Sequence, residues 1–237
     1  MSMIDVHCHL LPGVDDGSKD WETTLEMCQM ARADGVSHIV CSPHANYQYP
    51  YNRESHQQLI EELRRRVPDM EFSLGCDFHL SYENVDDAIA HPERYVIGRT
   101  NYLLIELSDF SLFNVGNTIF ELQRAGMRPI LTHPERYPHL QRRPEAVGEF
   151  FRQGCLVQIT ANSLTGSWGR TAQKVAVTLL KNSWVQMIAS DAHSSTRRVP
   201  ILSEARQAAA AIVGEEAATR LVETNPAAVI NNEAVML

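Results

Sequence analysis

Short apolar runs alternate along the chain with longer segments in which apolar residues recur at helical spacing. The helical spacing predicts helices over Asp20–Ala33, Arg53–Arg66, Asn114–Ala125, Pro144–Gln153 and Thr171–Asn182. The apolar and β-branched runs have the length of buried strands. Seven such strands are predicted, namely Met3–His9, Val36–His44, Met70–Asp77, Tyr102–Leu107, Arg128–His133, Cys155–Thr160 and Trp184–Asp191.

The spacing of these strands indicates the fold class. Their ends lie roughly 27–35 residues apart, which is about the length of one βα unit with its loops. This repetition favours an α/β fold with parallel strands, as a barrel or an open sheet, over a sandwich. The Ala-rich segment Ile201–Leu221 and a short helix from Asn225 are expected to buttress the strands. Because no linker-like tract interrupts the pattern, residues 1–237 are predicted to form a single domain.

Polar residues gather where the predicted strands end. The carboxyl ends of parallel strands share one rim, which is where barrel enzymes carry their active sites. In the first strand, alternation places His7 and His9 on one face and Cys8 on the other. Eight residues of metal-ligand type occupy this rim: His7, His9, His44, Asp77, Glu106, His133, Asp191 and His193.

Each of these residues has an ordinary structural explanation when taken alone. A single histidine is more often a hydrogen-bonded core or surface residue, and Asp77 or Asp191 could cap the following helix. Residues of metal-ligand type recur at the ends of six predicted strands, which helix caps alone do not readily explain. Clustered carboxylates without cations are also costly to desolvate. The pattern therefore predicts a metal centre with only nitrogen and oxygen ligands, suited to zinc, manganese or iron.

Several ligands at one rim imply more than one ion. Paired or tripled metal ions can activate water and neutralise charge on a phosphoryl group, which is metal-assisted phosphoester hydrolysis. Amide hydrolysis is the alternative chemistry. A carbamylated lysine at a strand end, common in amidohydrolases, has no candidate here, since Lys19, Lys174 and Lys181 fall in a loop or in helices.

Composition removes other classes of protein. With 44% hydrophobic and 21% charged residues and no long apolar run, the chain is expected to be cytoplasmic, without membrane insertion. Its net charge of −8 disfavours a nucleic-acid partner. The five cysteines form no CxxC pair, and none is followed six positions later by arginine, so a cysteine-based phosphatase is excluded. The sequence does not indicate the oligomeric state.

The motifs at the rim resemble a known family. They are DVHCHLLPGVDDG at 5–17, SPH at 42–44, GCD at 75–77, LLIEL at 103–107, THPERY at 132–137, QITANSLTG at 158–166 and SDAH at 190–193. In this order, over almost the whole chain, they resemble the polymerase-and-histidinol-phosphatase (PHP) superfamily. More narrowly, they resemble the manganese-dependent protein-tyrosine phosphatases of capsule and exopolysaccharide operons.

The resemblance implies a distorted seven-stranded βα barrel with three divalent metal ions, with manganese the first expectation and iron or zinc the alternatives. It implies that His7, His9 and Asp191 hold one ion, that Glu106 and His133 hold a second, and that Asp16, His44 and His193 hold a third. Asp77 stands where the family usually has a glutamate that bridges the first two ions. Asp77 is expected to bridge with its shorter side chain, and His79 is the nearest substitute.

Two arginines match family positions that hold the substrate phosphate. They are Arg136 in HPERY and Arg198 after SDAH, with the adjacent Arg197 as a competitor for the second role. A guanidinium fork beside a metal cluster complements a phosphoryl group better than lysine does.

The resemblance implies a protein-tyrosine phosphatase in which a metal-bound hydroxide attacks phosphotyrosine in line, without a phosphoenzyme. The implied partner is a bacterial tyrosine autokinase that controls polysaccharide synthesis. Two alternatives stay open: a small-molecule phosphatase such as histidinol-phosphate phosphatase, and a non-catalytic regulator that binds the kinase tail.

Overall fold

The computed structural model describes residues 2–107 and 115–236. Within these residues the strands form two parallel sheets, with the orders β1-β2-β4 and β3-β5-β6-β7-β8-β9. Their bounds are β1 (Met3–Cys8), β2 (Val36–Cys41), β3 (His44–Ala45), β4 (Glu71–Leu74), β5 (Asp77–His79), β6 (Tyr102–Glu106), β7 (Arg128–Thr132), β8 (Leu156–Thr160) and β9 (Met187–Ala189). The prediction of a parallel α/β fold is confirmed.

Two of the predicted strands are each split into two. The run Val36–His44 becomes β2 and β3, and the run Met70–Asp77 becomes β4 and β5, so each run begins in one sheet and ends in the other. Pro43 has no backbone N–H to donate, and it interrupts the first run. Gly75 interrupts the second run, where the chain passes so close to Val40 and Ile97 that a Cβ would lie 3.1 Å from each side chain. The prediction of unbroken strands here was wrong because periodicity does not show where a ladder changes partner.

The single seven-stranded barrel is not confirmed as a closed ring. Beside β9, strand β1 makes only the isolated bridge Cys8–Ala192 in the described part of the chain. Backbone hydrogen bonds from Asp191 N to His7 O (2.8 Å) and from His9 N to Ala192 O (2.9 Å) continue this seam. The strands therefore surround a common interior as two sheets that meet at their carboxyl ends.

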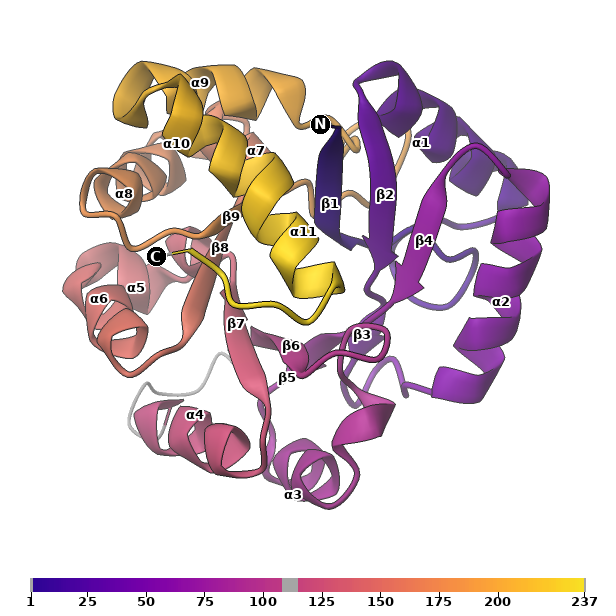
Figure 1. Cartoon of the computed structure of the whole chain (residues 1–237), viewed down its shortest axis with the longest axis horizontal. Helices are drawn as coiled ribbons and strands as arrows, with labels where there is room; N and C mark the ends of the chain where they lie inside the picture. The colour runs from indigo at the N-terminus through magenta and orange to yellow at the C-terminus, as the bar shows by residue number, and fades with distance from the viewer. Residues whose placement is uncertain (1, 108–114, 237) are drawn as a thin grey trace.

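Helices enclose the strands, as Figure 1 shows. The predicted helices appear as α1 (Trp21–Ala33), α2 (Arg53–Arg66), α4 (Val115–Arg124), α6 (Glu145–Arg152) and α8 (Gly169–Lys181), while the predicted first residue of α4, Asn114, lies outside the described residues. Short elements next to strand ends were not predicted: α3 (Tyr82–Ala90), α5 (Pro138–Arg142), α7 (Ala161–Leu164) and the 3-10 turns Pro92–Arg94 and Pro134–Arg136. They contain too few turns to show a periodic apolar face.

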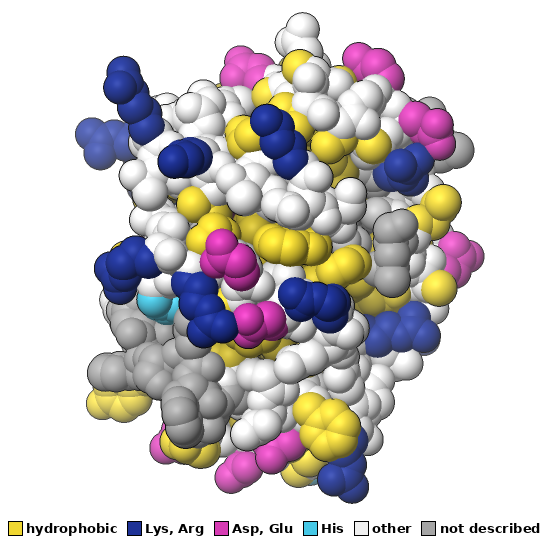
Figure 2. All heavy atoms as spheres, turned by 90° about the vertical axis from the view of Figure 1, so that its left-hand side faces the viewer, with side chains coloured by type: hydrophobic (Ala, Val, Ile, Leu, Met, Phe, Trp, Pro, Cys, Tyr) yellow, Lys and Arg dark blue, Asp and Glu magenta, His cyan; other side chains and the backbone are white. Residues whose placement is uncertain are grey.

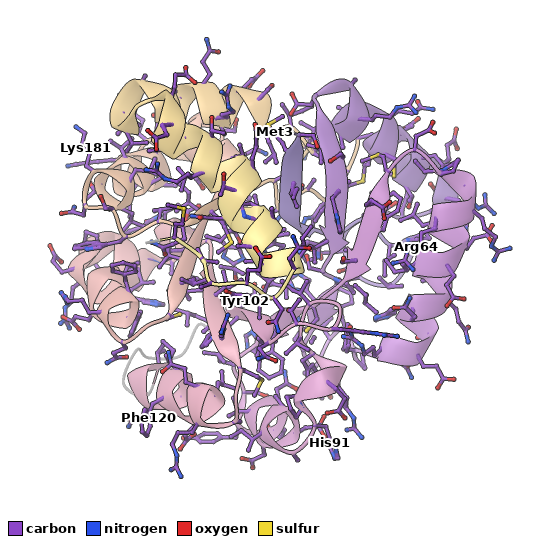
Figure 3. The ribbon with its side chains drawn as sticks, in the orientation of Figure 1. Met3, Arg64, His91, Tyr102, Phe120 and Lys181 are labelled. Atoms are coloured by element: carbon purple, nitrogen blue, oxygen red, sulfur yellow. The ribbon has the colours of Figure 1, made fainter. Side chains whose placement is uncertain are left out.

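The carboxyl-terminal segment contains α9 (Ser203–Val213), α10 (Glu215–Thr219), a π-helical turn (Arg220–Thr224) and α11 (Asn225–Ile230). Helix α9 packs on α7 and α8, while α11 and the residues after it cover the amino ends of the strands. Tyr102, labelled in Figure 3, donates its hydroxyl to Glu233 O at 2.5 Å, and Asn101 N donates to Asn232 Oδ1 at 3.0 Å. The opposite, carboxyl ends of the strands therefore stay available for a site.

The core has two parts, one on each side of the strands. The larger cluster packs the strands against the surrounding helices through residues such as Met27, Ile60 and Leu179. The smaller cluster lies among the strands and is closed by α11; its buried members are Ile4, Val6, Val40, Ile97, Tyr102, Leu104, Ile130, Leu156, Met187, Ala189 and Val229. Strands buried on both faces account for the near-continuous apolar runs in the sequence. Among the described residues, no helix has the length and apolar content needed to cross a bilayer.

The packing of α6 on Trp184 can be tested with Gly148→Ala. A Cβ at this position would lie 2.6 Å from two atoms of the Trp184 indole. Alanine favours a helix over glycine by about 1 kcal/mol, but overpacking costs about 1–3 kcal/mol. We expect the clash to dominate and the free energy of unfolding in urea to fall by about 1–2 kcal/mol. The exposed Glu145→Ala in the same helix is the control, and an unchanged or raised stability for Gly148→Ala would contradict this packing.

Candidate metal centre

The nine predicted ligands lie close together near the rim formed by the strand ends. His7 and Glu106 lie near the ends of β1 and β6, and His44 and Asp77 are the first residues of β3 and β5, which follow β2 and β4. Asp16 belongs to the loop after β1. His9 and His133 follow β1 and β7 directly, and Asp191 and His193 lie in the loop after β9. Their donor atoms form four overlapping groups, in each of which the atoms lie within 4.8 Å of one another.

The first group contains His7, His9 and Asp191. Val6 belongs to the smaller core cluster, among the strands, and Cys8 belongs to the larger one, between the strands and the helices. The pairing of β1 with β2 shifts register between Asp5 and Cys8. The Nε2 atoms of His7 and His9 lie 3.1 Å from each other. Asp191 has a left-handed backbone (φ 51°), and its Oδ1 lies 3.5 Å from His7 Nε2 and 3.4 Å from His9 Nε2.

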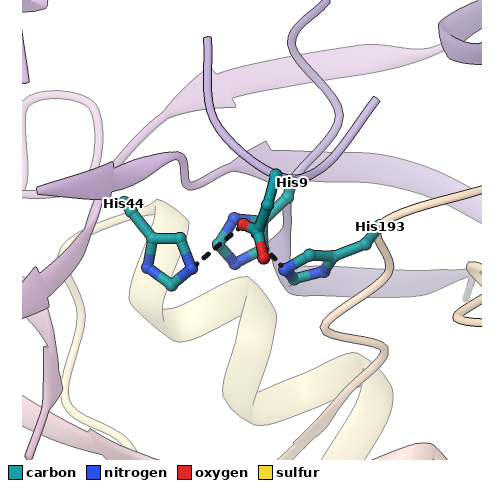
Figure 4. Close-up of side chains that lie close together, drawn as sticks. His9, His44 and His193 are labelled. Carbon is teal, nitrogen blue, oxygen red and sulfur yellow. Dashed lines mark ion pairs between the residues drawn. The ribbon is translucent and has the colours of Figure 1, made fainter. Parts of the chain in front are cut away.

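A second group contains His9, Asp16, His44 and His193. Asp16 Oδ1 lies 3.4 Å from His44 Nε2 and 3.5 Å from His193 Nε2, the two contacts marked in Figure 4, and the ring of His9 lies beside them. Burial lowers the pKa of His193 to about 4, which keeps its imidazole neutral, as a metal ligand must be. The structure thus adds His9 to the predicted set of Asp16, His44 and His193.

Asp77 lies between the remaining ligands. Its Oδ2 is 3.5 Å from His7 Nε2, 3.6 Å from His44 Nδ1 and 3.7 Å from His133 Nε2. Its Oδ1 accepts a hydrogen bond from Thr132 Oγ1 at 3.2 Å. Burial opposes ionisation of this carboxyl, but the surrounding histidines hold its pKa well below the usual range. Asp77 therefore belongs to two of the donor groups and faces histidines from three strands or strand ends.

Glu106 and His133, predicted to hold one ion together, fall in different groups. Glu106 Oε2 lies 3.6 Å from His44 Nδ1, while His133 joins His7 and Asp77. His133 Nε2 is 3.9 Å from Glu106 Oε1. Asp77 belongs to the group of Glu106 and to the group of His133, and it therefore lies between these two residues. His79, the suggested substitute, has its Nδ1 3.5 Å from Glu106 Oε2.

Unpaired polar atoms show that these residues fit metal ions. Among the described residues, Asp77 Oδ2, His44 Nδ1 and His193 Nε2 are buried and have no hydrogen-bond partner. A buried carboxylate oxygen or imidazole nitrogen without a partner is costly. All three atoms point into groups made only of nitrogen and oxygen donors, the ligands that suit manganese, iron or zinc.

Two residues that the sequence did not single out orient the ligands. Asp15 Oδ2 lies 2.7 Å from His9 Nδ1 and accepts from His44 N, while its Oδ1 accepts from Gly17 N. Burial of His9 favours its neutral form, but the hydrogen bonds and charges of Asp15 and Asp191 together outweigh burial and raise the pKa of His9 to about 10. A metal ion bound at the other ring nitrogen would displace this proton. Gln158 Oε1 lies 2.9 Å from His7 Nδ1. The resemblance assigned Asp16 to the third ion and gave no role to its neighbour Asp15, and a single glutamine in an apolar strand was the only signal for Gln158.

Asp5, also unrecognised in the sequence, connects β1 to β9 beneath the ligands. Its carboxylate accepts from Ser190 N at 3.0 Å and from Ser190 Oγ at 2.5 Å, and it accepts from His7 N at 3.3 Å. Burial raises the pKa of Asp5 to about 6. This contact holds the SDAH segment against the HxH segment.

The two predicted arginines meet at Asp191. Arg136 donates through a terminal guanidinium nitrogen to Asp191 Oδ2, and Arg198 donates to the same oxygen at 2.6 Å. Arg197, the competitor for the second position, is exposed. The Asp191 carboxylate thus faces the histidines with Oδ1 and two guanidinium groups with Oδ2.

The cysteines do not contribute a nucleophile. All five are buried. Burial raises the pKa of Cys28 and Cys155 to about 12 and raises the pKa values of Cys8, Cys41 and Cys76 well above their ordinary value. A thiolate is required for nucleophilic attack, so none of these thiols is suited to it.

Comparisons with known proteins agree with this geometry. The family model for capsular polysaccharide synthesis, CpsB/CapC, matches residues 3–231. Tyrosine-protein phosphatase YwqE of Bacillus subtilis is 30% identical over 202 residues, covering 83% of this chain and 79% of YwqE. Tyrosine-protein phosphatase CpsB of Streptococcus pneumoniae is 25% identical over 244 residues, covering 98% of this chain and all of CpsB.

Solved structures extend the likeness to the fold. A crystal structure from the work on YwqE and CpsB, described there as unique metal-dependent tyrosine phosphatases, matches with a TM-score of 0.89 and 27% identity, over 99% of this chain and 96% of that one. Histidinol phosphate phosphatase of Lactococcus lactis, solved with zinc, L-histidinol and phosphate, matches with a TM-score of 0.62 and 12% identity, over 91% and 94% of the two chains. The second match shows a shared fold alone.

The role of Asp77 can be tested with Asp77→Asn. The amide has the size of the carboxylate and can still accept from Thr132, but it lacks the negative charge that two neighbouring cations require. We expect manganese affinity, measured by titration and by metal analysis, to fall about 10–100-fold or more. Asp77→Glu should retain part of the metal, and the exposed Asp69→Asn should retain all of it. Full metal content in Asp77→Asn would exclude Asp77 as a ligand.

Proposed function

The chain belongs to the capsular polysaccharide synthesis family CpsB/CapC, and on this premise we propose that it hydrolyses phosphotyrosine in proteins as a metal-dependent phosphatase. One observation carries the proposal: the Asp191 carboxylate touches the histidine cluster with one oxygen and two guanidinium groups with the other. A metal centre and an anion-binding pair of arginines are therefore immediate neighbours. This is the arrangement that a phosphoryl group needs.

The proposed ligands are His7, His9, Asp16, His44, Asp77, Glu106, His133, Asp191 and His193. We propose that they hold three divalent ions, with manganese the first candidate and iron or zinc the alternatives. Bound there, the ions would activate water and neutralise charge on the phosphoryl oxygens. Asp15 and Gln158 orient His9 and His7, and Asp77 connects the donor groups as the bridging carboxylate.

The arginines bind and orient the substrate. Their ion pairs with Asp191 place both guanidinium groups at the edge of the cluster, where they can each donate to a phosphoryl oxygen. A cavity of about 320 Å³ opens beside them, lined by residues that include Glu106, His133, Arg136, Tyr137 and Trp168. Its aromatic walls suit the ring of a tyrosine leaving group.

We propose a bacterial tyrosine autokinase as the protein substrate and a cytoplasmic location for the reaction. Support comes from the capsule-synthesis family and from the tyrosine-phosphatase relatives. The face drawn in Figure 2 carries Lys and Arg side chains dispersed among acidic and apolar ones. We propose that the arginine pair beside Asp191 supplies the local attraction for an anionic substrate. The histidinol-phosphate alternative rests on the shared fold alone. We further propose that the two sheets represent the distorted seven-stranded barrel, supported by the β1–β9 seam.

The central test is hydrolysis of a phosphotyrosine peptide before and after removal of metal. We expect a chelator to abolish turnover and added manganese to restore it, because the ligands supply only nitrogen and oxygen donors. Alkylation of thiols should leave turnover unchanged, since all five cysteines are buried. The matching phosphoserine peptide and histidinol phosphate serve as competing substrates. Turnover that survives full demetallation, or faster hydrolysis of histidinol phosphate, would refute the proposal.

Arg136→Ala and Arg198→Ala test the anion-binding pair. Each variant should keep its full metal content, because the guanidinium groups contact Asp191 from the side away from the histidines. We expect each to lose on the order of 1.5–3 kcal/mol of transition-state stabilisation in kcat/KM for the phosphotyrosine peptide. The exposed Arg197→Ala should behave like the unmodified chain. Equal losses at Arg197 and Arg198, or no loss at Arg136, would place the phosphate elsewhere.

A further inference from the structure

Both arginines of the site lie against the same tryptophan. The guanidinium carbon of Arg136 is 4.0 Å from the centre of the Trp168 ring, and that of Arg198 is 5.4 Å from it. These distances fall within the range of cation–π attraction. Trp168 is 40% exposed, so its indole is part of the molecular surface beside the metal centre.

The backbone of the loop that carries Trp168 is constrained, which limits where the indole can lie. The loop connects α7 to α8. Gly166 and Gly169, on either side of Trp168, have φ values of +95° and +86°, which residues with a side chain rarely adopt. Trp168 N donates to Asn162 O at 3.3 Å, and Gln173 Nε2 donates to Leu164 O at 3.1 Å. The tryptophan therefore extends from a turn that is fixed at both ends.

The arginines themselves come from two other parts of the chain. Arg136 ends the 3-10 turn after β7, and Arg198 lies in the loop after β9, where its carbonyl accepts from His193 N at 2.8 Å. The two arginines thus come from separate turns of the backbone. Both guanidinium groups contact Asp191 Oδ2, and both lie over the Trp168 ring.

Because both guanidinium groups contact one carboxylate oxygen, two positive charges lie close together, and the Trp168 ring offsets part of their repulsion. Two cations on one carboxylate oxygen repel each other, and Asp191 supplies a single negative charge, which metal ions would also draw upon. The face of an indole carries the negative part of the ring quadrupole and attracts a guanidinium group without adding a net charge. A second carboxylate in the same place would neutralise the pair and weaken its hold on an anion.

We propose that Trp168 is a positioning residue that holds Arg136 and Arg198 side by side as one clamp for a phosphoryl dianion. The inference rests on the proposed function, since it takes the arginine pair as the phosphate-binding element. It adds that the clamp is prepared before substrate binds, with the ring restricting both guanidinium groups. When phosphate arrives, its oxygens supply the negative charge that the paired cations lack.

The test uses the full chain loaded with manganese and measures binding of inorganic phosphate by calorimetry, together with kcat and KM for the phosphotyrosine peptide. Trp168→Leu keeps much of the bulk but removes the aromatic face, and Trp168→Phe keeps an aromatic face. We expect Trp168→Leu to weaken phosphate binding about tenfold and Trp168→Phe to recover most of that loss. Metal content should stay unchanged in both.

Trp21→Leu is the matched control, because Arg66 lies 4.3 Å from the Trp21 ring between α1 and α2. It removes the same kind of contact away from the site, and phosphate binding should not change. In a chain that already carries Arg136→Ala and Arg198→Ala, adding Trp168→Leu should cause little further loss, since the residues through which it acts are gone.

Three results would overturn the proposal. If Trp168→Leu binds phosphate as well as Trp168→Phe, the ring serves as packing and not as a cation–π surface. If Trp168→Leu adds its full loss to the double arginine variant, the tryptophan contacts the substrate directly. If the unmodified, metal-loaded chain binds no phosphate, there is no clamp. Failure of the proposed function would appear separately, as an unmodified chain that does not hydrolyse the phosphotyrosine peptide.

Discussion

The cost of burying carboxylates among histidines governs the architecture of this protein. Asp77 and Asp191 are almost completely buried, and their oxygens lie 3.4–3.7 Å from imidazole nitrogens at distances that leave room for ions between them. Charges in such surroundings are expensive unless cations compensate them. The imidazoles alone do so incompletely, as the unpaired Asp77 Oδ2 shows within the described residues. The fold keeps these groups together because the rest of the molecule is stable enough to hold them.

That stability comes from parallel strands buried on both faces. Their carboxyl ends meet at one rim, so residues far apart in the sequence become neighbours there. Local backbone geometry places the individual side chains. His7 and His9 are two residues apart at the end of β1, and their Nε2 atoms lie 3.1 Å from each other. The parallel pairing of β3 with β5 places Asp77 opposite His44. At His133 and Asp191 a left-handed backbone, uncommon for residues with a side chain, redirects the chain into the site.

The arginine side of the site follows from the same carboxylates. Asp191 divides its two oxygens between the histidines and the guanidinium pair, so the proposed metal centre and the proposed anion-binding pair share one side chain. Asp5 adds a structural connection, because its bonds to Ser190 hold the segment that carries Asp191 and His193 against β1. Chemistry that needs both cations and a bound anion is thereby concentrated within a few ångströms of one seam between the two sheets.

The sequence by itself determined the long helices, most of the strands and the side of the fold on which the polar residues gather. Apolar runs and helical spacing are local properties, so α2 was predicted with its observed ends, and the strand-end residues of metal-ligand type were recognised from their places in the runs. The choice between neighbours could not be made in this way. Asp15 orients His9 while its neighbour Asp16 faces His44 and His193, and Arg198 reaches Asp191 while Arg197 is exposed.

Only the tertiary structure decided how the ligands are grouped, where Val36–His44 and Met70–Asp77 change sheets, and that Trp168 lies against both arginines. These features depend on distances between segments that are distant in the sequence, to a precision of about 1 Å, the scale on which hydrogen bonds and metal contacts form or fail. A periodic pattern contains no information about such distances. It shows which face of its own helix or strand a residue occupies, and it does not show which residues of other segments that face contacts.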